Sequence, residues 1–323
     1  MNRSYVLGID IGGTNTVIGV VDARGNVIGA TSLKTQIRPS FSEYVEDIHH
    51  ETLNLLGTLD INIDEIQGIG VGAPNANFYN GTIENAANLR WKGVLPLADE
   101  LHDKFGIPVA CTNDANAAAI GEMTYGAAKG MKNFIMITLG TGVGSGIVAN
   151  GQLLYGSNGF AGELGHVTVK RNNGRLCGCG RSGCLECYCS ATGVARTARE
   201  MLEFSSEPSQ LRNLELSEIT SKDVYDAAIA GDKVAIQVFN YTGKVLGEAF
   251  SNFVTFSAPE AIILFGGLAK SGDLLLRPIK KHMEENMLFV WKDKVKVLLS
   301  ELKDTDAAVL GASALGWEAD KKY

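Results

Sequence analysis

Residues 6–30 read VLGIDIGGTNTVIGVVDARGNVIGA, and residues 134–156 read FIMITLGTGVGSGIVANGQLLYG, with the same pattern. Each stretch has an apolar strand, a glycine-rich turn, a second apolar strand, a short turn and a third strand. Asn150-Gly151 is a typical two-residue hairpin turn between alternating strands. The same β-meander therefore opens each half of the chain, and we predict two similar halves with a cleft between them.

Helical patterns follow each meander. Apolar residues recur at helical spacing in 40–57, behind a serine that can cap the helix. Further helices are predicted at 96–106, from about residue 114, and at 190–203, 221–230, 232–256 and 306–321, and further strands at 66–74, within 260–269 and at 294–300. Strands that alternate with helices are typical of an α/β fold. The repeat places the boundary between the halves near residue 115.

Composition narrows the class of protein. The chain has 323 residues, of which 45% are apolar and 20% charged, and its net charge is −7. A nucleic-acid-binding protein more often carries a basic surface. The apolar run near the N-terminus is too short for a signal peptide, and no stretch approaches the ~18 apolar residues of a transmembrane helix. We expect a cytoplasmic protein that binds neither nucleic acid nor membranes.

Three glycine turns directly follow apolar strands: DIGGTN at 10–15, LGTGVGSG at 139–146 and FGG at 265–267. Glycine lets backbone amides approach a ligand, and successive amides bind anions, although each turn alone could equally be a tight hairpin. Asp10 beside the first turn suits a Mg²⁺ ion held directly or through water. A P-loop motif is absent, and strand residues follow GSGIVA at 144–149 where a dinucleotide-binding motif requires a helix.

Five of the six cysteines lie in LCGCGRSGCLECYC, residues 176–189. In a reducing compartment such a cluster indicates metal binding or redox chemistry rather than disulfides. Cys177, Cys179 and Cys184 can supply three thiolates to a tetrahedral zinc ion. The chemistry leaves two candidates for the fourth ligand, Cys187 and His166.

Asn113 and Asp114 lie in CTNDANAAA, at the start of a predicted alanine-rich helix. Both residue types are favoured at helix N-termini, so helix capping accounts for them without any function. Phosphoryl transfer to a hydroxyl group also requires a carboxylate that accepts the hydroxyl proton. The residues alone favour helix capping as the role of Asn113 and Asp114, and a catalytic base at Asp114 is the alternative.

The run ITLGTGVGSGIVANGQLLYGSNGFAGELGH (137–166), followed by CGCGRSGCLE (177–186), resembles the ROK family of bacterial repressors, open reading frames and sugar kinases. The paired glycine loops resemble the wider hexokinase and actin-like ATPase superfamily. The resemblance covers essentially the whole chain, and within the family it is greatest to glucokinases. It implies two RNase H-like α/β lobes around a central cleft. The first lobe would comprise 1–115 and 306–323, and the second 116–305 with a zinc loop at 166–186.

The resemblance also implies an activity, namely ATP-dependent phosphorylation of the 6-hydroxyl of glucose with Mg²⁺, in a protein that often forms homodimers. Asp114 would be the general base. The sugar would be bound by Gly72, Asn88, Asn113, Asp114, Glu163, His166 and Glu186. ATP would be bound by Asp10, Gly12, Gly13, Thr14, Asn15, Gly140, Thr141, Gly142, Gly266 and Gly267. A structural Zn²⁺ would be bound by His166, Cys177, Cys179 and Cys184. The chain departs from the family at Pro74-Asn75, where the family's turn usually reads Pro-Gly.

The alternatives are a related kinase for another sugar, a repressor, a nucleic-acid-binding protein and a filament protein. Kinases of the same family for N-acetylglucosamine, N-acetylmannosamine, fructose or allose share this pattern, so the identity of the sugar stays open. A repressor of the family would carry a helix-turn-helix domain before the first glycine loop, whose strand begins here at about residue 5. A zinc-ribbon nucleic-acid-binding protein is disfavoured by the acidic charge. An actin-like filament protein would leave the set of Glu163, His166 and Glu186 unexplained.

Overall fold

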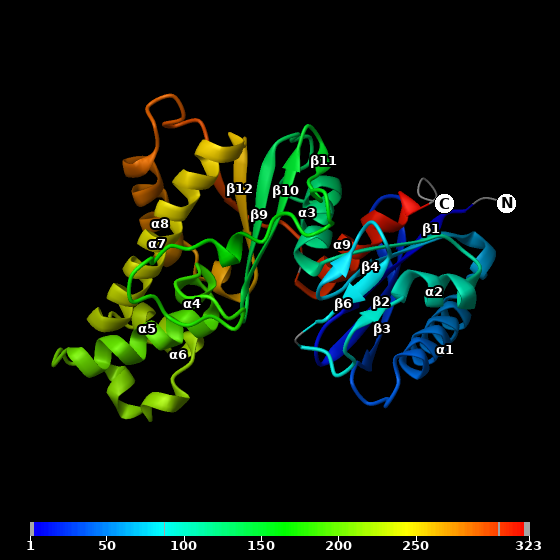
Figure 1. Ribbon diagram of the computed structural model, residues 1–323, viewed down its shortest axis with the longest axis horizontal. Helices are drawn as coiled ribbons and strands as arrows, with labels where there is room; N and C mark the ends of the chain where they lie inside the picture. The colour runs from blue at the N-terminus through cyan, green and yellow to red at the C-terminus, as the bar shows by residue number, and fades with distance from the viewer. Residues whose placement is uncertain (1–2, 87, 303, 320–323) are drawn as a thin grey trace.

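The computed structural model describes residues 3–86, 88–302 and 304–319 and shows two α/β lobes on either side of a cleft (Figure 1). Each lobe is built around a five-stranded sheet with its own hydrophobic core. The predicted α/β class with two lobes is confirmed.

The first sheet consists of β1 (Tyr5–Ile11), β2 (Asn15–Asp22), β3 (Val27–Lys34), β4 (Ile66–Gly72) and β8 (Val109–Thr112). Its strand order is β3-β2-β1-β4-β8. The first three strands form an antiparallel meander, and β4 and β8 continue the sheet in parallel with β1.

The second sheet consists of β9 (Phe134–Leu139), β10 (Val143–Ala149), β11 (Gln152–Leu153), β12 (Ala261–Phe265) and β13 (Lys296–Leu299). Its order, β11-β10-β9-β12-β13, repeats that of the first sheet with the same strand directions. The duplication predicted from the two meanders is confirmed, with a shorter third strand in the second copy.

The first lobe also contains α1 (Phe41–Leu59), α2 (Leu97–Phe105), the short helix η1 (Ile63–Glu65) and a small sheet of β5 (Ala76–Asn77), β6 (Thr82–Glu84) and β7 (Val94–Leu95). The serine cap predicted for the first helix is present: Ser40 Oγ accepts a hydrogen bond from the backbone nitrogen of Glu43, and the Glu43 carboxylate accepts one from the backbone nitrogen of Ser40. The small sheet was not predicted, because strands of two or three residues carry no readable periodicity.

The helix α9 (Asp304–Gly316) packs directly on β1 and β4 of the first sheet. A Cβ atom at Gly8 would lie 2.3 Å from the carbonyl oxygen of Val309, and one at Gly70 would lie 1.8 Å from that of Ala312. Larger residues at these two positions would therefore push the helix off the sheet. The predicted closing helix is confirmed in the described part of the chain, and its residues 320–321 lie outside the described residues.

The helix α3 (Asp114–Tyr125) follows β8 and packs both on α9 and on β9 and β10 of the second sheet. It therefore joins the two lobes and begins where they face each other (Figure 1). The division of the chain into 1–115 with 306–323 and 116–305 stays a prediction, and residues 1–2 and 320–323 of that division lie outside the described residues.

The second lobe is completed by helices on its sheet: α4 (Glu186–Cys189), α5 (Ala191–Phe204), α6 (Ser221–Ile229), α7 (Lys233–Ser257), α8 (Asp273–Asn286), and the short η2 (Leu164–His166), η3 (Gln210–Asn213), η4 (Leu216–Glu218) and η5 (Gly267–Ser271). A helix was predicted around His282, but its bounds were not; Pro278 lies inside α8, and proline usually ends a helix. The proline ring packs on α7, where a Cβ atom at Gly243 would lie 2.5 Å from Pro278 Cγ.

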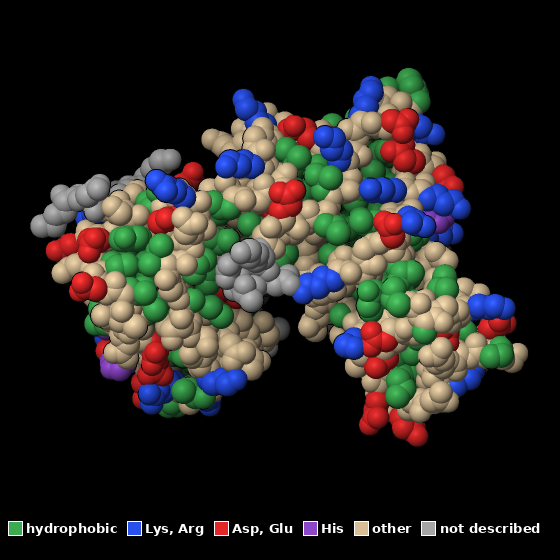
Figure 2. Space-filling model, turned by 180° about the vertical axis from the view of Figure 1, so that it is seen from behind, with side chains coloured by type: hydrophobic (Ala, Val, Ile, Leu, Met, Phe, Trp, Pro, Cys, Tyr) green, Lys and Arg blue, Asp and Glu red, His purple; other side chains and the backbone are tan. Residues whose placement is uncertain are grey.

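Figure 2 shows the opposite face of the molecule, with a groove between the lobes. On this face Lys and Arg side chains are interspersed with Asp and Glu side chains, and they do not form one broad basic surface. Among the described residues, no helix is long and apolar enough to cross a membrane.

Candidate functional site

A cavity of about 840 Å³ lies between the lobes. This volume is within the range of small-molecule sites. Its walls come from the end of β1, the start of α3, the β9–β10 turn, the segment after β11 and the loop before α4. Of the predicted site residues, those that line it are Asp10, Asn88, Asn113, Asp114, Gly140, Thr141, Gly142, Glu163, His166, Cys179, Glu186 and Gly266.

Asp114 is the first residue of α3, and its carboxylate is exposed to the cavity. Its Oδ1 atom accepts a hydrogen bond of 2.8 Å from the backbone nitrogen of Ala115, which leaves Oδ2 available to a ligand. The surrounding protein desolvates the carboxylate and so raises the pKa of Asp114. Asp114 can therefore act as a proton acceptor in the cavity.

Asn113 caps α3, and its Oδ1 atom accepts a hydrogen bond of 2.7 Å from the backbone nitrogen of Asn116. Its side chain also lies near the Glu163 carboxylate of the second lobe, and this contact opposes the rise in the pKa of Glu163. Because the oxygen serves the cap, the amide nitrogen of Asn113 remains as the group that can donate to a neighbouring acceptor. The capping interpretation and the ligand-binding interpretation are thus compatible at this residue.

Asp10 lies at the end of β1, beside Asp114. Burial, and then the nearby Asp114 carboxylate, raise the pKa of Asp10 to about 6. Gly72 packs against both residues, since a Cβ atom there would lie 3.7 Å from Asp10 Oδ1 and 3.7 Å from Asp114 Cα. Two carboxylates this close attract a cation, and oxygen ligands of this kind suit Mg²⁺.

Glu163, His166 and Glu186 form the opposite wall. Glu163 precedes the 3₁₀ helix η2 and His166 ends it, so the two side chains three positions apart lie on one side. Burial raises the pKa of Glu163; His166 opposes this rise, and the Asp114 and Glu186 carboxylates add to it. Glu186 Oε2 accepts a hydrogen bond of 3.0 Å from the backbone nitrogen of Val143. The wall therefore presents several strong acceptors for hydroxyl groups.

The predicted metal ligands come together. One ligand atom from each of His166, Cys177, Cys179 and Cys184 lies within 4.8 Å of all the others. Cys177 Sγ is 3.7 Å from His166 Nδ1, and Cys179 Sγ is 3.7 Å from Cys184 Sγ. A tetrahedral zinc ion with Zn–S bonds of about 2.3 Å requires sulfur atoms about 3.8 Å apart. The donor set and its spacing therefore fit Zn²⁺.

The alternative fourth ligand, Cys187, lies outside this group of four, and its Sγ donates instead to the carbonyl oxygen of Leu176. His166 has Nδ1 on the cysteine side and also lines the cavity, so Nε2 is the nitrogen available to a ligand there. Glu186 Oε1 accepts from Cys177 Sγ at 3.7 Å. The metal cluster and the cavity lining thus share His166 and Cys179, and Glu186 of the lining contacts Cys177.

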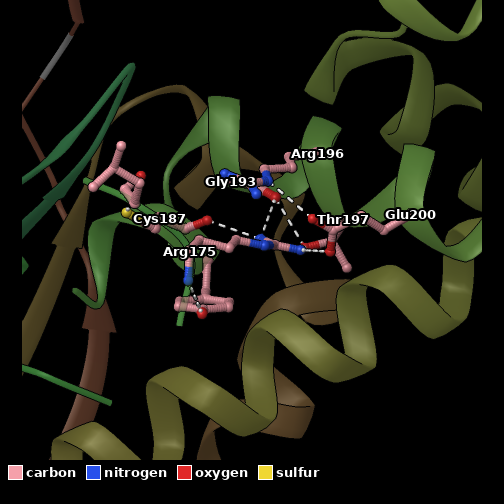
Figure 3. A network of polar contacts seen from close by, with 8 residues as sticks. Arg175, Cys187, Gly193, Arg196, Thr197 and Glu200 are labelled. Atoms are coloured by element: carbon pink, nitrogen blue, oxygen red, sulfur yellow. Dashed lines mark hydrogen bonds and ion pairs between the residues drawn. The ribbon is translucent and has the colours of Figure 1, made fainter. Parts of the chain in front are cut away.

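Arg175 holds the loop that leads into the cysteines (Figure 3). Its side chain is 7% exposed and donates from Nη1 to the carbonyl oxygen of Cys187 at 2.8 Å, and from Nη2 to Glu200 of α5 at 2.6 Å. The guanidinium also lies 4.6 Å from the ring centre of Tyr188. Arg175 therefore fixes α4, which begins with Glu186, against α5.

Not every predicted residue lines the cavity. Those that do not are Gly12, Gly13, Thr14, Asn15, Gly72, Gly267, Cys177 and Cys184. Asn15 turns away, since its Oδ1 accepts a hydrogen bond of 2.8 Å from Lys34 Nζ at an exposed position. The first glycine turn is closed by a backbone hydrogen bond of 3.0 Å from Gly12 to Asn15.

The departure from the family at Pro74-Asn75 has a structural explanation. Asn75 lines the cavity and has a φ of 51°, in the left-handed region that favours glycine. Asparagine adopts this conformation more readily than most other residues. Its Nδ2 donates to the carbonyl oxygen of Glu84 at 3.0 Å. Asn75 therefore keeps a turn suited to glycine and adds a polar side chain there.

Ser145 is a cavity residue that the sequence did not single out. Its Oγ donates to the carbonyl oxygen of Gly162 and accepts from the backbone nitrogen of Leu164 at 3.0 Å. It thus ties β10 to the segment that carries Glu163. The signal was present in GSG at 144–146, where only the glycines were interpreted.

The comparisons with known proteins agree with this site. The ROK family model matches residues 6–319. A glucokinase of Halalkalibacterium halodurans is 38% identical over 319 residues, which are 98% of this chain and 95% of that protein. A putative xylose repressor of Caldicellulosiruptor sp. is 27% identical over 97% of this chain and 78% of the repressor. The crystal structure of a ROK family glucokinase from Streptomyces griseus, in complex with glucose and AMPPNP, has a TM-score of 0.80 and 32% identity, covering 97% of this chain and 99% of that one. The chain belongs to the ROK family, with the hexokinase-like fold that its sequence predicted.

Proposed function

We propose that this protein is an ATP-dependent hexose kinase that transfers the γ-phosphate of ATP to the 6-hydroxyl of glucose. The observation that carries the proposal is the Asp114 carboxylate, which lines the cavity between the lobes and lies near Glu163 of the opposite wall. The similarity to glucokinases covers 97–98% of the chain and supports glucose as the first sugar to test.

The sugar would lie between Asn113 and the wall made of Glu163, His166 and Glu186. Carboxylates and a neutral imidazole nitrogen accept hydrogen bonds from hydroxyl groups, and a carboxylate can accept two at once. The Asn113 amide lies near Glu163, so it could donate to a sugar hydroxyl group that Glu163 also binds. This arrangement would orient the sugar and leave the 6-hydroxyl facing Asp114.

Asp114 would accept the proton of the 6-hydroxyl through Oδ2 while the hydroxyl oxygen attacks the γ-phosphorus. The bond between the γ-phosphorus and the bridging oxygen of ATP breaks, and ADP leaves. The raised pKa makes Asp114 a stronger base than an ordinary aspartate. Catalysis of this kind depends mainly on positioning and on neutralising phosphate charge.

The phosphates of ATP would be bound by backbone amides of the β9–β10 turn around Gly140 and Gly142 and by the turn after β1. A Mg²⁺ ion, held by Asp10 directly or through water, supplies charge neutralisation when it is bound with ATP. The pKa of Asp10 is raised first by burial and then by the Asp114 carboxylate, and a cation held beside the two groups would offset both effects.

We also propose that the cluster of His166, Cys177, Cys179 and Cys184 binds a structural Zn²⁺. When bound, the ion would fix the orientation of His166, and it would restrain Glu186 through the chain, because Glu186 lies two residues after the ligand Cys184. Thiolate ligands require a reducing compartment, which supports a cytoplasmic location. The homodimer stays a prediction that sizing in solution would test.

The proposal is tested by a coupled assay of ADP release with ATP, Mg²⁺ and a panel of hexoses and N-acetylhexosamines. We expect glucose to give the highest kcat/KM. A higher value for an N-acetylhexosamine would change the substrate but keep the reaction. If the protein binds a sugar but releases ADP with no member of the panel, the kinase proposal is contradicted and a sugar-sensing regulator is favoured.

A further inference from the structure

The two lobes also touch beside the cavity, through three aromatic rings that we name the aromatic clasp: Phe78, Tyr79 and Tyr155. Phe78 and Tyr79 follow β5 in the first lobe, and Tyr155 follows β11 in the second. The rings of Phe78 and Tyr155 are stacked, with centroids 3.9 Å apart and planes within 8°. The Tyr79 ring meets Tyr155 at 6.1 Å and 62°. The clasp therefore joins the lobes through a close aromatic contact.

Polar contacts extend the clasp along the segment after Tyr155. The Tyr79 hydroxyl donates to the carbonyl oxygen of Gly156 at 2.7 Å, and Asn77 Nδ2 donates to that of Asn158 at 2.9 Å. Gly159 approaches closely, since a Cβ atom there would lie 2.4 Å from Asn77 Oδ1. The second-lobe segment is thus held to the first lobe over several residues.

Tyr155 also reaches the turn that carries the catalytic pair. Its hydroxyl lies near the side chain of Thr112, the buried residue directly before Asn113, and this contact lowers the pKa of Tyr155 slightly against the larger effect of burial. Thr112 Oγ1 accepts from Asn116 Nδ2 at 3.2 Å, so its own hydrogen is available to the tyrosine oxygen. Burial raises the pKa of Tyr155 far above its usual value, so the hydroxyl stays neutral. Tyr155 therefore contacts the residue that positions Asn113 and Asp114.

The same residue anchors the segment that ends at Glu163. The carbonyl oxygen of Tyr155 accepts a hydrogen bond of 3.0 Å from the backbone nitrogen of Ala161, two residues before Glu163. Ser145 holds the following Gly162 and Leu164. A shift of Tyr155 would therefore move the Glu163 segment relative to Asn113 and Asp114.

We propose that Tyr155 is a positioning residue for sugar phosphorylation, which sets the distance between the Glu163 segment of the second lobe and the Asn113–Asp114 turn of the first. This inference rests on the proposed kinase function. Tyr155 is not a member of any hydrophobic core cluster among the described residues. Its loss should therefore disturb the contact between the lobes more than the folding of either lobe.

The experiment compares Tyr155→Leu, Tyr155→Phe and a control, Tyr225→Leu. Tyr225 is also half-buried and meets another ring, Phe239 at 6.5 Å, but it lies on α6, far along the chain from the clasp. For Tyr155→Leu we expect the KM for the sugar to rise about 3- to 10-fold, which is the effect of losing an aromatic pair. The factor by which the KM for ATP rises should be at least threefold smaller than the factor for the sugar. Tyr155→Phe keeps the stacking, so its KM for the sugar should be close to that of the unaltered protein.

Phe78→Leu should behave like Tyr155→Leu, and the double variant should be no worse than either single variant, because both changes remove one contact. Equal rises of the KM for sugar and for ATP, or additive effects in the double variant, would overturn the positioning role.

A second readout needs no substrate. Backbone amide exchange in 156–163 should be faster in Tyr155→Leu than in the unaltered protein, and unchanged in Tyr225→Leu. Unchanged exchange in Tyr155→Leu would overturn the inference. If the unaltered protein phosphorylates no hexose, the proposed function fails, while this measurement still decides whether Tyr155 holds the segment.

Discussion

Replacing Asp10 with asparagine should stabilise the protein while it removes activity. Asp10 has a pKa of about 6 in the folded protein against an ordinary value of 3.8. The folded state therefore holds its proton more tightly than the unfolded state. Above pH 6 the ionised Asp10 destabilises the folded protein, and this effect disappears as the pH falls through 6 towards 3.8.

The magnitude follows from the shift. A difference of about two pKa units corresponds to about 3 kcal/mol of unfolding free energy at neutral pH. The new amide must itself be hydrated or paired, so we expect Asp10→Asn to gain about 1–2 kcal/mol. For domains of this size each kcal/mol raises the Tm by about 2–4 °C.

Urea denaturation without ATP or added Mg²⁺, at pH 7.5 and at pH 4.5, measures this effect. We expect Asp10→Asn to be more stable than the unaltered protein at pH 7.5 and close to it at pH 4.5. Asp22→Asn is the opposite control: burial alone would raise its pKa, but hydrogen bonds from Asn26 and Arg24 hold the pKa of Asp22 below its usual value. An Asp10→Asn variant that is no more stable at pH 7.5 would refute the reasoning.

Two further predictions concern the wall of the cavity and the cluster. Gly142→Ala should strongly raise the KM for the sugar, because the new Cβ atom would lie 2.3 Å from Glu186 Oε2 and displace that carboxylate. Gly140→Ala is the control: no atom lies within 4 Å of its Cβ position, so the KM for the sugar should not change. Equal effects of the two variants would contradict the role of Glu186 in sugar binding. Cys179→Ser should lose bound zinc, as measured by elemental analysis, whereas Cys187→Ser should keep it. Zinc retained by Cys179→Ser, or lost only from Cys187→Ser, would exclude the assigned ligand set.

Much of the fold could be predicted because it follows from local patterns. The two meanders and the helices with apolar stripes lie within a few residues of their predicted positions. The bounds of α8 could not be predicted because the packing that accommodates Pro278 is not local: Gly243 on another helix makes room for the proline ring. Similarly, glycines within β1 and β4 serve the close approach of α9, which sequence order alone does not show.

The site shows the same division between local and distant information. The cysteine spacing predicted three thiolates, and the resemblance supplied His166; the structure brings the four together. ATP binding by the first glycine turn stays a prediction, and a sequence cannot show which atoms of the turn face a cavity or that the Asn15 side chain contacts Lys34. Tyr155 could not be predicted, because its contacts join segments far apart in the chain.

The most direct test of the central claim is the turnover and sugar affinity of Asp114→Asn. Loss of the proton acceptor should lower kcat by about 100- to 10,000-fold, while the Kd for glucose, measured by calorimetry, should change far less. Asp273→Asn, an exposed carboxylate on α8 paired with Arg277, is the matched control and should keep normal turnover. An Asp114→Asn variant with the turnover of the unaltered protein would contradict the account.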